Sequence, residues 1–525
     1  MPDYEHPLDV NLRDLHRAME LDVSGRPVVR TVSSTGRSDA GAQGAFGENI
    51  VSELTPTFQL DGLYGLPTTQ FETFEYLGSA QSTGTLMEVK SSTSINGYAV
   101  IRSRRAVRYR PGQGAITRFT AKFSAPQPGC TQRAGFFTQE QALQVGYNGS
   151  DFGILRQNGG KAHIHKFNID VVSDGAETLT LTLNDYAIAI PLTTTTIPEN
   201  AQEIAAAIKA DPAGNALWVV EYGNDHVSVL STSIGPKTGL FEANLPGSIE
   251  ISNSQAQAGV ANTDSWIYQP AFNLDKLDGT GPSGMDLQYN KLNVYQIQFR
   301  WLGAGEIRFA IEDPGSGNLI YFHHIHYSNE NIDVHLDNPS LKVGYVAANL
   351  SGALLAQEVT VAGGSIMGAI EGKIFPTKNP TATSQTSTVN INANIITHIL
   401  TIKNRTLFQN KINTRDFILK NLNAAFSTSS SAPTVIRVFL DLSTLPDLTY
   451  DTLNENLSSV YYSQTQTVVD ITNDIPIFVL DVVSSVSQDM QDFDIHVAPG
   501  SCLSIVVAST AQITRSGTGI TWLED

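Results

Sequence analysis

From about residue 61 onward, apolar and polar residues alternate in short runs that are separated by Gly, Pro, Asn and Asp. The side chains of a strand point in turn to its two faces, so this period of two predicts half-buried β-strands. Two series of such runs have a similar rhythm, one within 61–170 that closes with AHIHKFNIDVV and one within 264–375. Together they predict one antiparallel β-sandwich that is interrupted by an insertion.

The pattern changes in the segment between the two series, 171–263. Two strand-like runs, ETLTLTL and YAIAIPL, are separated by a short Asn-Asp turn, which predicts a hairpin. In the run that follows, Pro198 precedes apolar residues at helical spacing, among them Ile204 and Ile208. We therefore expect this insertion to be a small α+β unit.

Near the C-terminus the composition changes again at 376–388, where KNPTATSQTST is typical of a linker. Regularly spaced strand-like runs then continue through 389–525 and predict a second antiparallel sandwich. No repeat with a period of about 20–50 residues is visible, which disfavours a β-helix or a propeller.

The composition of the first 60 residues differs from that of the rest and is typical of an arm rather than of a domain. Leu12, Leu15 and Met19 recur at helical spacing and predict a short helix with one apolar face. This face could dock onto a neighbouring subunit or pack back onto its own domain. The predicted fold class is therefore mainly β, with tandem antiparallel sandwiches of a jelly-roll or lectin-like kind, a small α+β insertion and an extended N-terminal arm.

The composition and net charge of the chain argue against several classes of protein. Hydrophobic residues make up 41% of the chain and charged residues only 16%, and the two cysteines suggest no disulfide framework. No apolar signal core or run of about 18 apolar residues is present, so we expect no membrane partner. The net charge of −18 argues against general nucleic-acid binding.

One cationic stretch stands out against this acidic background. No acidic residue occurs between Glu88 and Glu140, although the stretch carries several arginines. The segments on either side of the turn RPGQG predict a hairpin, and in the first of them the even-numbered arginines would line one strand face. These subunit-interface candidates are Arg102, Arg104, Arg108 and Arg110. Their anionic partners could be carboxylates of this chain, carboxylates of another subunit, or phosphate.

Histidines offer the best lead to a metal. His324 and His326 share a strand face, as do His163 and His165, and two such pairs on adjacent strands could bind zinc or nickel. No carboxylate or cysteine lies at a ligand-like offset, so ordinary half-buried strand histidines are the alternative. We expect no cofactor.

Aromatic residues beside amides and carboxylates offer a basis for glycan binding. The candidates are Tyr147, Asn148, Asp151 and Phe152 in GYNGSDFG, together with Trp266 and Tyr268. Alternatively, the aromatic residues belong to the core and the polar residues to turns. No nucleophile motif or P-loop is present, and glycoside hydrolysis would require a pair of carboxyl groups across a cleft.

Three long segments of the chain are YAVIRSRRAVRYRPGQGAITRFTAKF, QVGYNGSDFGILRQNGGKAHI and LNVYQIQFRWLGAGEIRFAIEDPGSGNLIYFHHIHYSN. They resemble segments of virion structural proteins of tailed bacteriophages and other large DNA viruses. SCLSIVVAST and SGTGITWLED resemble the final strands of a C-terminal sandwich in such proteins. The resemblance implies an architectural role without a catalytic site. It implies a spike, fibre, or vertex- or capsid-associated component on the exterior of the head or tail.

The leading hypothesis is therefore a non-enzymatic virion structural protein that forms a homo-oligomer, a trimer first of all. It would be made in the host cytoplasm and would contact other virion proteins and the host surface, where a glycan is a candidate partner. The alternatives are a lectin-like carbohydrate-binding protein and a polysaccharide-degrading enzyme.

Overall fold

The computed structural model describes residues 19–21, 27–29, 54–175, 177–245, 247–350, 357–372, 381–385, 390–430, 432–445, 448–454 and 457–524. The chain divides into two units, Met1–Val51 and Ser52–Asp525. In the first unit, β1 (Met19–Leu21) pairs with β2 (Pro27–Val29). Met19 is therefore part of a strand, not of the predicted helix, and Leu12 and Leu15 lie outside the described residues.

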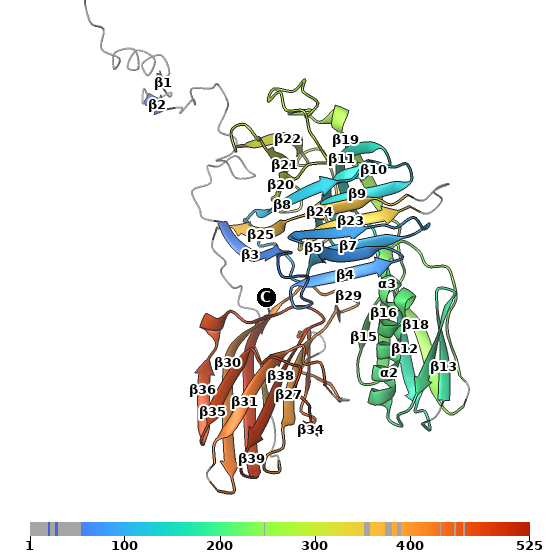
Figure 1. The fold of residues 1–525 in the computed structure, drawn as a ribbon, viewed down its shortest axis with the longest axis vertical. Coiled ribbons are helices and arrows are strands. Elements are labelled where there is room, and N and C mark those ends of the chain that lie inside the picture. The colour runs from blue at the N-terminus through green and yellow to red at the C-terminus, as the bar shows by residue number, and fades with distance from the viewer. Residues whose placement is uncertain are drawn as a thin grey trace, which may run out of the picture. The chain divides into compact units, whose positions relative to one another are not determined.

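Two large antiparallel sheets form the first sandwich of the second unit (Figure 1). The seven-stranded sheet contains, in spatial order, β19 (Thr263–Tyr268), β11 (Asp151–Asn158), β10 (Ala142–Asn148), β9 (Cys130–Phe137), β23 (Lys342–Asn349), β7 (Tyr98–Ser103) and β4 (Phe71–Tyr76). The nine-stranded sheet contains β22 (Leu319–Ile325), β21 (Ile307–Glu312), β20 (Asn293–Phe299), β8 (Ala115–Phe123), β24 (Thr360–Gly363), β6 (Leu86–Lys90) and β5 (Ser79–Thr83), with β25 (Ser365–Glu371) beside β8 and β3 (Leu54–Asp61) beside β25.

Apolar side chains from both sheets meet in one core between them. Ile101 and Phe136 come from the seven-stranded sheet, and Phe119 and Ile297 come from the nine-stranded sheet. Alternate residues of each strand enter this core, which is the arrangement that the period of two predicts. The other face of each sheet is left for polar side chains and for neighbouring elements.

The predicted hairpin across RPGQG is wrong. Its two segments became β7 and β8, which lie in different sheets. β7 pairs instead with β4 and with β23, a strand from far along the chain. The connection from Arg104 to Gly114 therefore carries the chain from one layer of the sandwich to the other.

The insertion forms a compact α+β unit with its own core, drawn in green in Figure 1. Its four-stranded sheet contains β15 (Trp218–Tyr222), β16 (His226–Ile234), β12 (Ala162–Val171) and β18 (Glu250–Gln257). Its three-stranded sheet contains β14 (Tyr186–Leu192), β13 (Glu177–Leu183) and β17 (Phe241–Asn244). The helices of this region are α2 (Ile197–Ala210) and α3 (Pro212–Leu217), and the 3₁₀ turn η2 (Gln269–Ala271) follows β19.

Two sequence expectations can be compared with this unit. α2 begins where the sequence predicts, because the Thr196 hydroxyl accepts a hydrogen bond from the Glu199 amide at the helix start and Ile204 and Ile208 are buried. AHIHKFNIDVV does not close the large sandwich, however. It forms β12, which pairs with β16 and β18 of the insertion, so the expected boundary at 170 is wrong.

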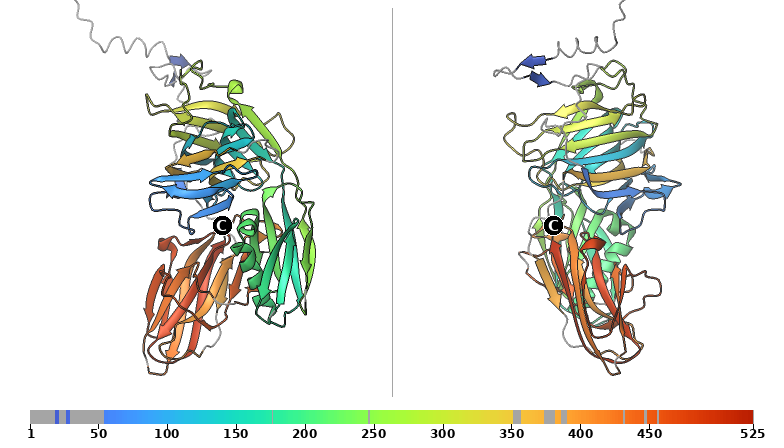
Figure 2. Two further views of the ribbon diagram at one scale, coloured as in Figure 1. Left: turned by 45° about the vertical axis from the view of Figure 1, so that its right-hand side comes forward. Right: turned by 90° about the vertical axis from the view of Figure 1, so that its left-hand side faces the viewer.

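The C-terminal sandwich, in orange and red in Figure 2, is also antiparallel. One sheet contains β26 (Thr381–Gln385), β39 (Ile513–Glu524), β30 (Phe417–Thr428) and β36 (Ser485–Asp489), with β37 (His496–Val497) beside β30. The other contains β32 (Asp451–Thr452), β33 (Val460–Ser463), β27 (Thr397–Asn404), β38 (Cys502–Ser509), β31 (Thr434–Leu440) and β35 (Phe478–Val482), with β34 (Thr467–Val468) beside β27. Smaller elements are β28 (Leu407–Phe408), β29 (Lys411–Ile412) and the 3₁₀ turn η3 (Gln491–Phe493).

The mainly β fold class with antiparallel sandwiches is confirmed. Part of the expected linker is instead a strand, because β26 pairs along β39. Likewise β3 begins at Leu54, so the last part of the expected arm belongs to the large sandwich. Within the described ranges, no helix combines the length and the apolar character that crossing a membrane requires.

Candidate functional site

The arginine row does not line one strand face. β7 ends at Ser103, so Arg102 lies in a strand whereas Arg104, Arg108 and Arg110 lie in the connection that follows. The strand ends there because the next backbone amides bond outside the ladder of β7. The Arg104 amide donates to the Gln70 carbonyl oxygen, and the Val107 amide donates to the Leu341 carbonyl oxygen. The predicted row is therefore wrong as a single charged face.

Arg102 belongs to a buried ion cluster on the outer face of the seven-stranded sheet. The Glu72 carboxylate accepts hydrogen bonds from Arg102 Nε at 2.7 Å and from Lys342 Nζ at 2.6 Å. These residues, the Glu72 cluster, come from the neighbouring strands β4, β7 and β23. Burial alone would raise the pKa of Glu72, but Lys342 and Arg102 outweigh it and lower that pKa to about 2. Burial also lowers the pKa of Lys342 to about 8.

The arginines after β7 turn toward the C-terminal sandwich. Arg105 Nε donates to Asp416 Oδ2 at 3.0 Å, and Arg104 Nη2 lies 4.0 Å from Asp441 Oδ2. Arg104 also donates to the Thr68 carbonyl oxygen at 2.6 Å. Carboxylates of the same chain were one of the three anion sources left open, and for Arg102 and Arg104 they are the partners observed. The subunit-interface role of the row stays a prediction.

Next to the Glu72 cluster, the outer face of the seven-stranded sheet borders a cavity of about 560 Å³. Side chains of β4, β7, β9, β10 and β23 form one wall, and Leu217, Thr232 and Ile234 of the insertion form the other. The two walls are joined by the Tyr98 hydroxyl, which donates to the Ala216 carbonyl oxygen and lies 3.2 Å from Thr232 Oγ1. We call this space the Gln144 cavity.

Gln144 is the most unusual residue of the cavity wall. Leu143 and Val145 point into the core, so the alternation of β10 directs Gln144 to the outer face. Its side chain is 0% exposed, yet neither its amide nitrogen nor its amide oxygen has a hydrogen-bond partner among the described residues. A buried polar group without a partner costs about 1–3 kcal/mol, which a ligand or water that reached this amide would recover.

Arg133 adds a charge to the same wall. Its Nε is buried and also has no hydrogen-bond partner among the residues that the structure describes. Burial lowers the pKa of Arg133, an effect that the nearby Asp264 opposes. Arg133 lies opposite Gly146, where a β-carbon would come within 1.9 Å of the Gln132 carbonyl oxygen. Only glycine fits there, so no side chain of β10 covers Arg133 at this position.

Half-buried aromatic residues and further amides complete the lining. Phe74, Tyr76 and Tyr98 present rings on β4 and β7, and the rings of Tyr76 and Tyr98 lie 6.4 Å apart. The amide-bearing residues of the lining are Asn96, Gln139, Gln144, Gln157 and Asn349. Rings offer flat apolar contacts, and amides offer both donors and acceptors, which is the combination that sugars require.

Of the four glycan-binding candidates in GYNGSDFG, two are buried in the core and two lie at the hairpin turn. Tyr147 and Phe152 are buried in the core, so the prediction that they face a ligand is wrong. Asn148 and Asp151 close the β10–β11 hairpin, and Asp151 is exposed. Asn148 Nδ2 donates to the hydroxyl of Tyr268 at 3.0 Å.

Trp266 and Tyr268 lie on β19, the last strand of the same sheet. Their rings are stacked with centroids 6.2 Å apart, and Trp266 also packs against the apolar cluster that contains Leu155. The structure thus brings Asn148, Asp151 and Trp266 to one edge of the sheet and adds the Gln144 cavity on its outer face. Sequence reasoning missed Gln144 and Arg133, because a polar residue between two apolar ones, such as Gln144 between Leu143 and Val145, is the ordinary pattern of a half-buried strand.

The two histidine pairs do not form one metal site. His163 and His165 lie on β12 of the insertion, whereas His324 lies on β22 of the large sandwich, so the predicted adjacency is wrong. His163 and His165 are buried, and the ring of Phe241 stacks on both with centroid distances of 4.6 Å. Burial lowers the pKa of His163 to about 4, so it is neutral at pH 7.

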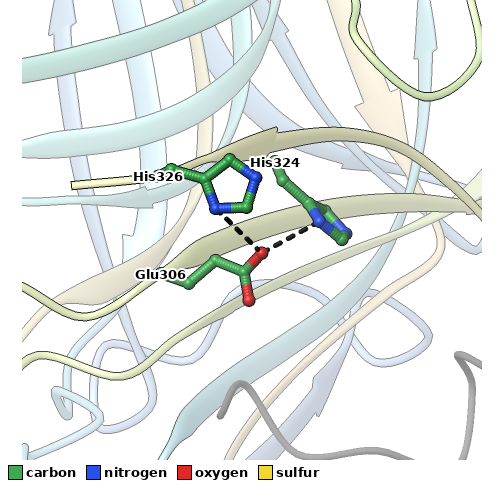
Figure 3. A group of neighbouring side chains, drawn as sticks. All are labelled: Glu306, His324 and His326. Carbon is green, nitrogen blue, oxygen red and sulfur yellow. Dashed lines mark ion pairs between the residues drawn. The ribbon is translucent and has the colours of Figure 1, made fainter. Parts of the chain in front are cut away.

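His324 and His326 have a different neighbour, which sequence reasoning missed. Figure 3 shows Glu306 pointing toward both rings: Glu306 Oε1 lies 2.9 Å from His324 Nδ1 and 3.7 Å from His326 Nδ1. Glu306 directly precedes β21, the strand that pairs with β22. No sequence offset could reveal it, because only the hairpin register brings the carboxylate opposite the histidines.

Comparison with known proteins gives limited guidance. No protein family and no curated protein sequence match the chain. Among solved structures, the carbohydrate recognition domain of Emp47p is similar at 9% identity and a TM-score of 0.23, covering 61% of this chain and 98% of that one. A lectin from Bauhinia forficata in complex with GalNAc is similar at 8% identity and a TM-score of 0.20, covering 60% and 98%.

A major capsid protein of mavirus is similar at 10% identity and a TM-score of 0.12, covering 95% of this chain and 93% of that one. With TM-scores of this size, function has to be argued from the side chains themselves. The resemblance to virion proteins stays a prediction.

Proposed function

We propose that the chain is a non-enzymatic binding protein that holds a short saccharide in the Gln144 cavity. The observation that carries the proposal is the buried Gln144 amide, whose donor and acceptor are both without a partner among the described residues. A sugar hydroxyl donates and accepts hydrogen bonds, so neighbouring hydroxyls of one ring can satisfy both ends of the amide. The cavity of about 560 Å³ is within the range usual for small-ligand sites.

The charges around the cavity favour an acidic saccharide. Arg102, Arg133 and Lys342 supply three positive charges on this face, against the carboxylates of Glu72 and Asp264. A ligand carboxylate could accept from Arg133 Nε, which has no partner among the described residues. We therefore expect a uronic or similar acid sugar to bind more tightly than its neutral parent.

The same lining argues for binding rather than catalysis. Hydrolysis of a glycosidic bond usually requires two carboxyl groups beside it, and none of the described residues that line this cavity is Asp or Glu. The polysaccharide-degrading alternative would need another site.

The first experiment is a glycan array followed by calorimetric titration of the best acidic saccharide and its neutral parent. Gln144→Leu should abolish binding while the far-UV circular dichroism spectrum stays unchanged. Gln255→Leu, the same substitution on an exposed position of β18, serves as the matched control and should bind as the wild type does. An array without hits, or a Gln144→Leu protein with full affinity, would overturn the proposal.

A second proposed role is assembly, which a specific surface favours. β35 is the last strand of its sheet, and large apolar side chains around it are exposed: Ile475 by 88%, Val483 by 69% and Val479 by 50%. Soluble proteins usually protect such strand edges with charges or cover them, and we propose that a second copy of this chain covers β35. A homo-oligomer of this kind, a trimer first, suits the virion component suggested by the sequence resemblance.

Light scattering tests this role. The wild-type chain should be a multimer, and Val479→Lys should reduce the mass toward that of one chain, because a desolvated lysine opposes strand pairing. Ile332→Lys is the control, since Ile332 is fully exposed away from β35. A monomeric wild type, or a Val479→Lys multimer of unchanged mass, would argue against assembly through this edge.

A further inference from the structure

The outer face of the β21–β22 hairpin carries two imidazoles and one carboxylate that belong neither to the Gln144 cavity nor to the β35 edge. His324 is close to the end of β22, His326 follows the strand, and Glu306 directly precedes β21. The hairpin register pairs Arg308 with His324, which brings Glu306 opposite His326. One potential ligand atom of each of Glu306, His324 and His326 lies within 4.8 Å of the other two.

These separations suit a tetrahedral ion. Zinc binds imidazole nitrogen and carboxylate oxygen at about 2.0–2.2 Å, so two of its ligands lie about 3.3–3.6 Å apart. The observed distances from Glu306 Oε1 are 2.9 Å to His324 Nδ1 and 3.7 Å to His326 Nδ1. The His326 side chain is 65% exposed, so its ring has room to rotate toward the separation that zinc requires.

The surroundings hold two of the ligands in place. Arg308 Nε donates to Glu306 Oε2 at 2.7 Å, which leaves Oε1 directed at the histidines (Figure 3). Asn273 fixes the backbone of His324, because its side chain donates to the His324 carbonyl oxygen at 2.8 Å and accepts from the His324 amide at 2.9 Å. Outer partners of this kind orient metal ligands in known sites.

We propose that Glu306, His324 and His326 form a zinc site with one open coordination position. Two neutral imidazoles and one carboxylate are a donor set that zinc favours, and three protein ligands leave a fourth position for water or for a ligand atom from outside the chain. The ion would tie β22, the last strand of the nine-stranded sheet, to the strand beside it at the open end of the hairpin. This role is independent of saccharide binding.

The test uses the full-length, tag-free protein after treatment with a chelator. Calorimetric titration with zinc chloride should give one site per chain, and bound Co²⁺ should show the visible absorption typical of a tetrahedral site. His326→Gln and Glu306→Gln should each lose both signals. His326 is largely exposed, so its variant is expected to fold, and the melting temperature without metal checks this.

His226→Gln is the matched control. His226 Nδ1 lies 2.7 Å from Asp225 Oδ1, so this pair offers one imidazole and one carboxylate without a second histidine. The control protein should bind zinc as the wild type does. Absence of zinc binding in the wild type, or equal binding by His326→Gln, would overturn the proposal. Equal losses in His226→Gln and His326→Gln would overturn it as well.

Discussion

The Glu72 cluster and the Gln144 cavity occupy the same outer face of one sheet but treat their buried polar groups in opposite ways. In the cluster, Glu72 accepts from both Arg102 and Lys342. In the cavity, the Gln144 amide has no partner among the described residues, and neither has Arg133 Nε. A buried polar group with partners contributes to the fold, whereas one without them weakens the fold and is available to a ligand. The contrast distinguishes the paired groups of this face, of which Arg102 also borders the cavity, from the unpaired groups that a ligand could satisfy.

Of the substitutions that test this comparison, Glu72→Gln should change the free energy of unfolding most, by lowering it. Without the carboxylate, Arg102 and Lys342 would be buried together with no counter-charge, which costs about 3–5 kcal/mol. Urea unfolding at pH 7 measures the loss. Glu75→Gln, at an exposed position of the same strand, is the control and should unfold at nearly the wild-type midpoint.

The same pair of proteins makes a prediction about pH. The pKa of Glu72 is lowered from 4.5 to about 2 in the folded chain, so its contribution is complete above pH 4.5 and is lost as the pH falls toward 2. The difference in unfolding free energy between wild type and Glu72→Gln should therefore narrow across this window. A constant difference would show that the carboxylate does not stabilise the fold through its charge.

Gln144→Leu should change the free energy of unfolding less than Glu72→Gln does, and in the opposite direction. The substitution removes a donor and an acceptor that have no observed partner and adds apolar contact with the sheet, so the free energy of unfolding should rise by about 1 kcal/mol. The measurement is the same urea titration, made without ligand. A clear loss of stability would mean that the amide is satisfied within the free protein, and the contrast between the two regions would disappear.

Arg104→Gln should have the smallest effect. Its ion pair with Asp441 is long, at 4.0 Å, and partly exposed, and its hydrogen bond to the Thr68 carbonyl oxygen is exposed to solvent, so the loss should be about 0–1 kcal/mol. Light scattering on the same variant asks whether Arg104 also acts between subunits. An unchanged mass would confine it to contacts within the chain, whereas dissociation would restore the interface role predicted for the arginine row.

The sequence predicts the strands far better than their partners. Alternation reveals strands such as β10, and the Pro198 segment reveals α2, because these signals lie within a few residues. Which strands pair is decided by contacts distant in the sequence: β7 joins β23, and β12 joins the insertion, although neither choice leaves a local trace. The predicted RPGQG hairpin and the boundary at 170 failed for this reason.

The candidate sites divide in the same way. Asn148, Asp151 and Trp266 could be named as candidates because a hairpin turn and an aromatic residue are visible locally, and their role in glycan binding stays a prediction. Glu306 and the unsatisfied state of Gln144 were not, since the first depends on register and the second on what the rest of the chain leaves unpaired. A glutamine in a strand resembles any other until its neighbours are known.

The central place of β23 has a consequence for biosynthesis. This strand lies between β7 and β9, so the seven-stranded sheet is incomplete until residue 349 has left the ribosome. At about 5–20 residues per second, β7 would wait roughly 10–50 s for its partner after its own synthesis. The insertion, whose strands lie within 162–257, can finish folding during that interval. During these roughly 10–50 s β7 would have only β4 beside it, and the apolar side chains of the unfinished sheet would stay uncovered, a state in which chaperones that act during translation commonly assist.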